Sequence, residues 1–175
     1  MLTVDWEPRF RRIFDLAATN YRAGVRGADV LFDTAEVAFL HSIGCRPQEL
    51  YDFVEDWCEY GEPTPDVAVK LAAIRRNYLL TEQHGRPTGR VQPADTFPPK
   101  DAEIGGFPWL PRIIAKARAK LRGELPPELM YGCAGDRRFL RDIGSDPVEF
   151  LRLVWQAENN DERILEFVRQ RAGRR

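Results

Sequence analysis

Residues 139–150 read FLRDIGSDPVEF, a pattern that predicts the end of one helix and the start of the next. Gly144 follows an isoleucine and is the residue type that most often ends a helix. Asp146 and Pro147 then stand in the order typical of a helix start, an N-cap acceptor followed by a first-turn proline. Residues 39–50, FLHSIGCRPQEL, carry the same Phe, Leu, Ile, Gly, Pro and Glu at positions lower by 100. We therefore predict two helical hairpins with one sequence pattern.

The correspondence at an offset of 100 extends beyond these hairpins. Arg12 and Ala17, for example, correspond to Arg112 and Ala117 without a gap. We interpret this register as an internal duplication, in which one helical unit occurs twice in the chain. The alternative is that two unrelated helical hairpins converged on similar caps.

The apolar residues elsewhere also recur at helical spacing. The segments concerned are 8–24, 34–40, 47–61, 65–85, 109–122, 147–154 and 160–168. No segment alternates apolar and polar residues as a half-buried strand would. Residues 86–108 are rich in Gly and Pro and lack a period, so we expect a linker there. The predicted fold class is all-α, with units of three to four helices at residues 1–85 and 109–175.

Composition excludes several classes of protein. The 175 residues carry 26 Lys and Arg against 27 Asp and Glu, so the strong basic excess of a histone-like protein is missing. No apolar run approaches the roughly 18–20 residues of a membrane span. Three cysteines are too few for a disulfide framework, which predicts a reducing, cytoplasmic location.

A basic helix at 109–122 is the clearest charged feature. It carries Arg112, Lys116, Arg118, Lys120 and Arg122 and no acidic residue. Because like charges on one helix repel, the pattern indicates a site for a small anion or an acidic surface. The alternative is a solvated helix face.

The segment 47–66 has the opposite charge, with seven acidic residues and no Lys or Arg. It is able to face the basic helix within one chain or between two chains, which predicts a homodimer as one option. Its acidity also argues against nucleic acid as a partner, although the hairpins have the order of a helix-turn-helix.

Two further patterns give weaker signals. Gly105 and Gly106 would suit an anion-binding turn of backbone amides, but a plain linker turn is the simpler explanation. His41, Cys45 and Cys58 lack the second ligand pair that a structural zinc site needs, so no metal is predicted. No dinucleotide or phosphate-loop motif is present either, and no cofactor is expected.

Several motifs in the second half fall in a recognisable order. They lie in IGGFPWLPRIIAKARAKLRG at 104–123 and YGCAGDRRFLRDIGSDPVEFL at 131–151. The region from about 95 to 171 resembles the bacterial domain-of-unknown-function family 5069. The matching positions are Gly105, Gly106, Leu110, Pro111, Arg112, Lys116, Arg118, Ala119, Tyr131, Cys133 and Asp136.

Two positions depart from the family's motifs. Ala115 stands where the family has a helix aspartate, and Gly132 stands where it has an asparagine. If those residues carry an activity in relatives, the resemblance implies that this unit has lost it. The first unit keeps an aspartate, Asp15, at the position equivalent to Ala115. The resemblance brings no function with it.

Three functions remain open from the sequence. The preferred hypothesis is a non-enzymatic helical module that binds a partner or a small anionic ligand in a groove between its units. Its candidate ligand-binding residues are Gly105, Gly106, Arg112, Lys116, Arg118, Tyr131 and Arg138. The second is an enzyme that acts on a small acidic metabolite through Cys133 and Asp136, assisted by Arg118 or Arg138. The third is nucleic-acid binding through the hairpins.

Overall fold

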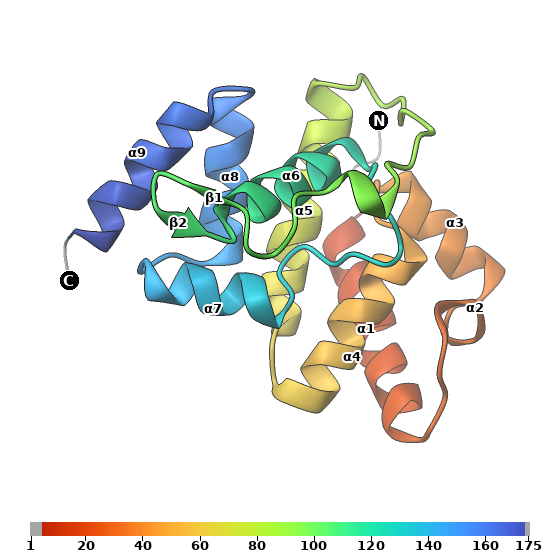
Figure 1. The fold of residues 1–175 in the computed structure, drawn as a ribbon. Helices are drawn as coiled ribbons and strands as arrows, with labels where there is room; N and C mark the ends of the chain where they lie inside the picture. The colour runs from red at the N-terminus through yellow and green to blue at the C-terminus, as the bar shows by residue number, and fades with distance from the viewer. Residues whose placement is uncertain (1–4, 174–175) are drawn as a thin grey trace. The chain divides into compact units, whose positions relative to one another are not determined.

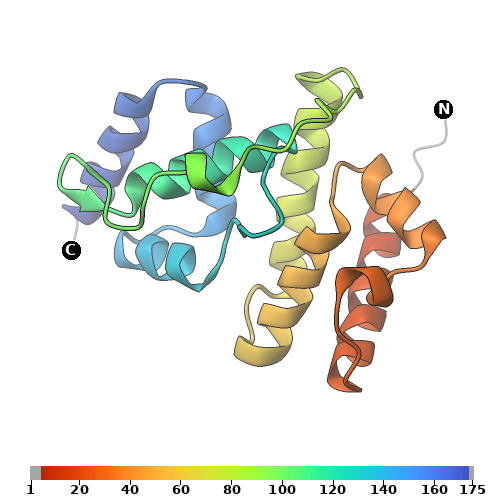
Figure 2. The same ribbon diagram turned by 45° about the vertical axis from the view of Figure 1, so that its right-hand side comes forward.

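The computed structural model describes residues 5–173 and confirms the all-α class. Residues 1–4 and 174–175, at the ends of the two predicted units, lie outside the described range. Contacts along the chain divide it into unit 1, Met1–Pro87, and unit 2, Thr88–Arg175, each of which is described by itself (Figures 1 and 2). The division falls at the beginning of the predicted linker. None of the described helices is both long and apolar enough to cross a membrane.

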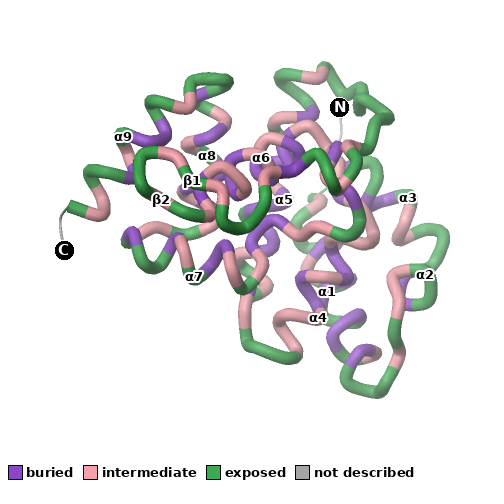
Figure 3. Tube along the Cα trace, viewed as in Figure 1, coloured by how far each residue is buried: buried purple, intermediate pink, exposed green. Residues whose placement is uncertain are grey.

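The described residues of unit 1 form five helices. They are α1 (Trp6–Arg22), α2 (Ala28–Leu31), α3 (Thr34–Ser42), α4 (Pro47–Tyr60) and α5 (Pro65–Thr81). Helix α1 packs against α2, α4 and α5, and its Phe10, Phe14 and Ala17 are buried in the core (Figure 3). The starts of α4 and α5 follow from the prolines at their first positions, and Gly61 ends α4 in the left-handed conformation.

The described residues of unit 2 form a short 3₁₀ helix, a short hairpin and four α-helices. Its elements are η1 (Ala94–Thr96), β1 (Glu103–Ile104), β2 (Phe107–Pro108), α6 (Leu110–Arg122), α7 (Ala134–Asp142), α8 (Pro147–Ala157) and α9 (Asp161–Ala172). Helix α8 contacts α6, α7 and α9, so it forms the centre of the unit. Its Phe150, Leu151 and Val154 are buried.

The glycines that follow helices α3 and α7 both have a left-handed backbone. Gly44 and Gly144 have φ angles of 76° and 69°, in the left-handed region that glycine adopts without a steric penalty. Each turn also has the equivalent backbone hydrogen bond. Cys45 N donates to Leu40 O at 2.9 Å, and Ser145 N donates to Leu140 O at 2.8 Å. Helices α3 and α7 thus end in the same way, while the duplication of whole units stays a prediction.

The predicted linker holds the one β-structure of the described residues. Strands β1 and β2 pair antiparallel, with Ile104 opposite Phe107. Gly105 and Gly106 form the turn between them, with φ angles of 60° and 81°. Strands of two residues are too short to show an alternating pattern, which explains why the sequence indicated none.

Candidate functional site

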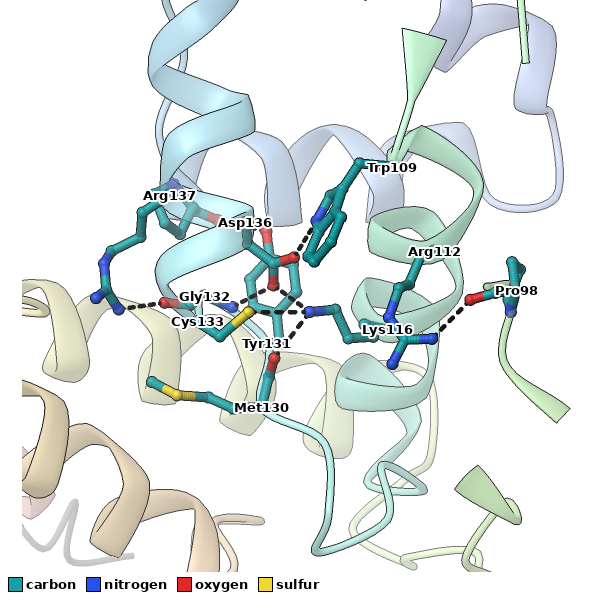
Figure 4. Close-up of polar contacts among 11 residues, drawn as sticks. Pro98, Trp109, Arg112, Lys116, Met130, Tyr131, Gly132, Cys133, Asp136 and Arg137 are labelled. Carbon is teal, nitrogen blue, oxygen red and sulfur yellow. Dashed lines mark hydrogen bonds and ion pairs between the residues drawn. The ribbon is translucent and has the colours of Figure 1, made fainter. Parts of the chain in front are cut away.

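A buried ion pair between α6 and α7 is the centre of the candidate site (Figure 4). Lys116 of α6 and Asp136 of α7 are only 2% and 0% exposed, and Lys116 Nζ lies 2.7 Å from Asp136 Oδ2. Removing both charges from water costs several kcal/mol per ion, so such a pair persists only when its remaining hydrogen-bonding groups are satisfied.

The Asp136 carboxylate receives two further hydrogen bonds. The indole Nε1 of Trp109 donates to Oδ1 at 2.8 Å, and the backbone amide of Gly132 donates to Oδ2 at 2.8 Å. Gly132 has a φ angle of 84°, a region that asparagine also tolerates. The replacement of the family's asparagine by Gly132 therefore leaves this contact in place.

The Lys116 ammonium also has two further acceptors. It donates to the carbonyl oxygen of Met130 at 3.0 Å and to the sulfur of Cys133 at 3.4 Å (Figure 4). An ammonium group has three N–H donors, and these contacts together with Asp136 use all of them. Lys116 is thus fixed in position, with one donor directed at a thiol.

Cys133 is the member of this cluster that remains partly exposed. It is a free cysteine at the N-cap position of α7, and its side chain makes no capping hydrogen bond. A partly exposed thiol in contact with a cation at a helix N-terminus has the surroundings that are typical of reactive cysteines. Cys133, Lys116 and Asp136 form the Cys133 cluster.

Trp109 shapes one side of the Cys133 cluster. Its backbone is left-handed, with φ of 74°, at the N-cap of α6. A Cβ at position 135 would lie 2.4 Å from Cζ2 of Trp109, so only glycine leaves room for this ring. The Lys116 ammonium lies 5.7 Å from the ring centroid, within the range of a cation–π contact. Neither Trp109 nor Gly135 was among the site residues expected from the sequence.

Tyr131 and Arg137 support the segment before α7. The Tyr131 hydroxyl donates to Pro147 O at 2.8 Å, and Arg137 Nη1 donates to Gly132 O at 2.7 Å. Burial raises the pKa of Tyr131 well above 10, and the nearby charges of Asp136 and Asp146 raise it further. Tyr131 therefore keeps its proton, and its hydrogen bond fixes the chain.

The other predicted ligand residues lie apart from the Cys133 cluster. Arg112 donates to Pro98 O at 2.6 Å. Arg118 pairs with Asp161 at 2.5 Å and donates to Glu158 O at 3.1 Å. Arg138 lies on the exposed side of α7, and Gly105 and Gly106 belong to the hairpin turn. Of the residues expected to cooperate, Cys133 and Asp136 both contact Lys116. Arg118 contacts neither of them.

The acidic segment of unit 1 also uses its charges locally. Tyr21 donates its hydroxyl proton to Glu55 and Glu59, at 3.3 and 3.0 Å. Asp52 accepts a hydrogen bond from Gln48 at 2.8 Å. Burial is the main cause that raises the pKa of Asp52 to about 7; the Gln48 hydrogen bond opposes the shift, and the charges of Glu55 and Asp56 add to it.

His41, Cys45 and Cys58 of unit 1 do not form a cluster. His41 is exposed, Cys45 is buried beside Arg46 O, and the Cys58 sulfur lies 3.8 Å from Ala18 O. Within residues 5–173, no group of three or more His, Cys, Asp or Glu side chains is placed to hold a metal ion.

Comparisons with known proteins bear on the second half of the chain. No curated protein and no solved structure matches the chain. A family model does match part of the chain, and the part that it matches contains the whole Cys133 cluster and helices α6 to α9. Residues 98–175 match the family model described as Domain of unknown function (DUF5069), which confirms the resemblance predicted from the sequence motifs.

Proposed function

We propose that unit 2 presents Cys133 as a nucleophile toward a small electrophilic ligand, with Lys116 stabilising the thiolate. The observation that carries this proposal is the 3.4 Å contact between the Lys116 ammonium and the Cys133 sulfur. The proposal develops the second hypothesis from the sequence, an enzyme that acts through Cys133 and Asp136. Lys116 takes the assisting role that was expected of Arg118 or Arg138.

Each residue of the Cys133 cluster then has a separate role. The sulfur of Cys133 forms the bond to the electrophile, because the thiolate is the reactive form of a cysteine. Lys116 supplies the positive charge that favours this form. Asp136 is a positioning residue: it touches Lys116 at 2.7 Å and keeps the ammonium beside the sulfur. This order of nucleophile, partner and orienting group is typical of activated nucleophiles.

The anion-binding hypothesis keeps less support. Arg112, Lys116 and Arg118 each donate to an acceptor inside unit 2, so none is held ready for a separate anionic ligand. A groove between the units, a dimer through the segments 47–66 and 109–122, and a nucleic-acid partner stay predictions. A reactive free thiol suits a reducing compartment, which is our reason to propose a cytoplasmic location.

The proposal is tested by the rate at which iodoacetamide alkylates Cys133. Replacing Lys116 alone would leave Asp136 buried without its partner, so the test variant is Lys116→Met with Asp136→Asn. A hydrogen bond to a charged group is worth about 1.5 kcal/mol or more, which corresponds to about tenfold in rate at neutral pH. We expect that loss, together with a changed pH dependence of the rate. Peptide mass spectrometry separates Cys133 from Cys45 and Cys58.

Arg118→Met is the matched control, because it removes a cation of the same helix that contacts Asp161 instead of Cys133. Circular dichroism establishes that each variant is folded. The control should alkylate at the wild-type rate. If the folded double variant also alkylates at that rate with the wild-type pH dependence, Lys116 does not activate Cys133 and the proposal is wrong.

A further inference from the structure

Helices α3 and α7 begin in the same way but carry different N-cap residues. Asp33 precedes α3 and Cys133 precedes α7, at positions that differ by 100. Their ψ angles are both 171°, and their φ angles are −76° and −62°. The two backbones therefore place the N-cap side chain in the same relation to the first turn of the helix.

The two N-cap side chains differ in what they offer to that turn. The carboxylate of Asp33 accepts a hydrogen bond from the amide of Glu36 at 2.8 Å. Cys133 makes no side-chain capping bond. The first amides of a helix have no acceptor within the helix, and an oxygen-bearing N-cap side chain normally supplies one. The start of α7 thus has the backbone of a capped helix and a side chain without oxygen.

We infer that Cys133 is a site of oxidation by peroxides, and that its sulfinate caps α7 as Asp33 caps α3. A sulfinate carries two oxygens on the atom bonded to Cβ, as the carboxylate of aspartate does. It would be negative at the positive end of the α7 dipole and beside the Lys116 ammonium. The inference rests on the proposed function, because oxidation requires a nucleophilic Cys133.

The chemistry needs only hydrogen peroxide as co-reactant. The Cys133 thiolate attacks one peroxide oxygen, an S–O bond forms and the O–O bond breaks. The leaving hydroxide takes a proton and departs as water, so sulfur loses two electrons and the peroxide gains them. A second peroxide converts the sulfenate to the sulfinate by the same exchange.

Neighbouring charges favour this product over the free thiol. Asp136 is the acidic residue of the Cys133 cluster. Its carboxylate is already paired with the Lys116 ammonium and accepts hydrogen bonds from Trp109 Nε1 and the Gly132 amide. The new anion would share the Lys116 ammonium, whose Nζ already contacts the sulfur at 3.4 Å. The structure therefore places a cation and a helix N-terminus where the sulfinate oxygens would form.

The experiment measures thermal unfolding of the full chain before and after peroxide treatment. Peptide mass spectrometry shows whether Cys133 has gained two oxygens. We expect oxidation to raise the Tm by a few degrees and to slow hydrogen exchange at the Asp136 amide, which corresponds to the capped Glu36 amide. Oxidation of a cysteine without a capping role would lower the Tm or leave it unchanged.

Two variants keep the test decisive. Cys133→Asp places the carboxylate directly and should raise the Tm without peroxide. Cys133→Ala, treated with peroxide in parallel, controls for oxidation of methionines and of Cys45 and Cys58. Its Tm should not rise. If Cys133 is oxidised and the Tm does not rise, or if Cys133→Asp is no more stable than Cys133→Ala, the inference is wrong.

The outcomes also separate the inference from the proposed function. Rapid, Lys116-dependent alkylation of Cys133 without oxidation by peroxide would overturn the inference and leave the proposed function standing. A Cys133 that reacts with neither reagent would overturn both.

Discussion

Replacing Gly135 with alanine should destabilise unit 2, although alanine is the better helix former. In an open position of a helix the change would stabilise the fold by about 1 kcal/mol. At Gly135, however, the new Cβ would lie 2.4 and 2.7 Å from two carbons of the Trp109 ring. Both atoms belong to a rigid ring that is half-buried, so the ring itself must move.

The loss follows from what the Trp109 ring does. Overpacking of this kind costs about 1–3 kcal/mol. Displacing the ring also breaks the 2.8 Å bond from its Nε1 to Asp136, a bond to a buried carboxylate worth about 1.5–3 kcal/mol. Against the gain of about 1 kcal/mol from helix propensity, the net effect is a loss of about 1.5–5 kcal/mol in the free energy of unfolding.

Urea denaturation followed by circular dichroism measures this loss, and a double-mutant cycle assigns it. In a Trp109→Ala background the ring is absent, so Gly135→Ala should stabilise unit 2 by up to about 1 kcal/mol. The sign of the effect should therefore reverse between the two backgrounds. A stabilising Gly135→Ala in the wild-type chain, or the same loss in both backgrounds, would refute the contact with Trp109 as the cause.

Two other substitutions have predictable effects. Gly144→Ala should lower the free energy of unfolding by about 1 kcal/mol, because its backbone is left-handed. Gly44→Ala should lower it by about 2 kcal/mol or more, because the new Cβ would also lie 3.2–3.3 Å from Leu79 and Arg75. Equal losses in urea denaturation would contradict this difference. The pKa of Asp52 rises from 3.8 to about 7 on folding, so the folded state holds this proton more tightly and the stability it contributes is lost as the pH rises through that range. At about 1.4 kcal/mol per pH unit, this pKa shift can lower the free energy of unfolding by at most about 4 kcal/mol. We expect about half of that loss, because the carboxyl is only partly buried. The free energy of unfolding of Asp52→Asn should therefore rise by about 2 kcal/mol relative to that of the wild type between pH 4 and pH 8. If the two proteins show the same dependence of stability on pH, the raised pKa of Asp52 is wrong.

Helix positions could be predicted from the sequence because their ends depend on local residues. Pro47 and Pro147 occupy first helical positions, and Gly61 and Gly123 follow last ones, as their sequence context indicated. These signals act within one turn of the chain and need no knowledge of the fold. The four-residue helix α2 and the two-residue strands were missed because such short elements have no measurable period.

The members of the candidate site could be predicted singly, but their arrangement could not. Lys116, Cys133 and Asp136 were all candidates, yet Lys116 was expected to meet a ligand or an acidic helix. Its partners come from the loop before α7 and the first turn of that helix. A spacing of four residues shows which side chains share a helix face and does not show whether that face is buried. Gly132 and Gly135, which flank the cysteine, were the sequence signal for a close approach of backbone and ring.

The buried ion pair is better explained by its effect on Cys133 than by a contribution to stability. Well-packed apolar residues often replace such a pair without loss, because desolvation offsets most of the attraction between the charges. Asp136 accepts from Lys116, from the Trp109 indole and from the Gly132 amide, whereas Lys116 directs one donor at a sulfur that is partly exposed. A purely structural lysine would have no need for an acceptor as weak as a thiol. The arrangement therefore holds a positive charge against Cys133, and the Lys116→Met, Asp136→Asn variant should lose more reactivity than stability.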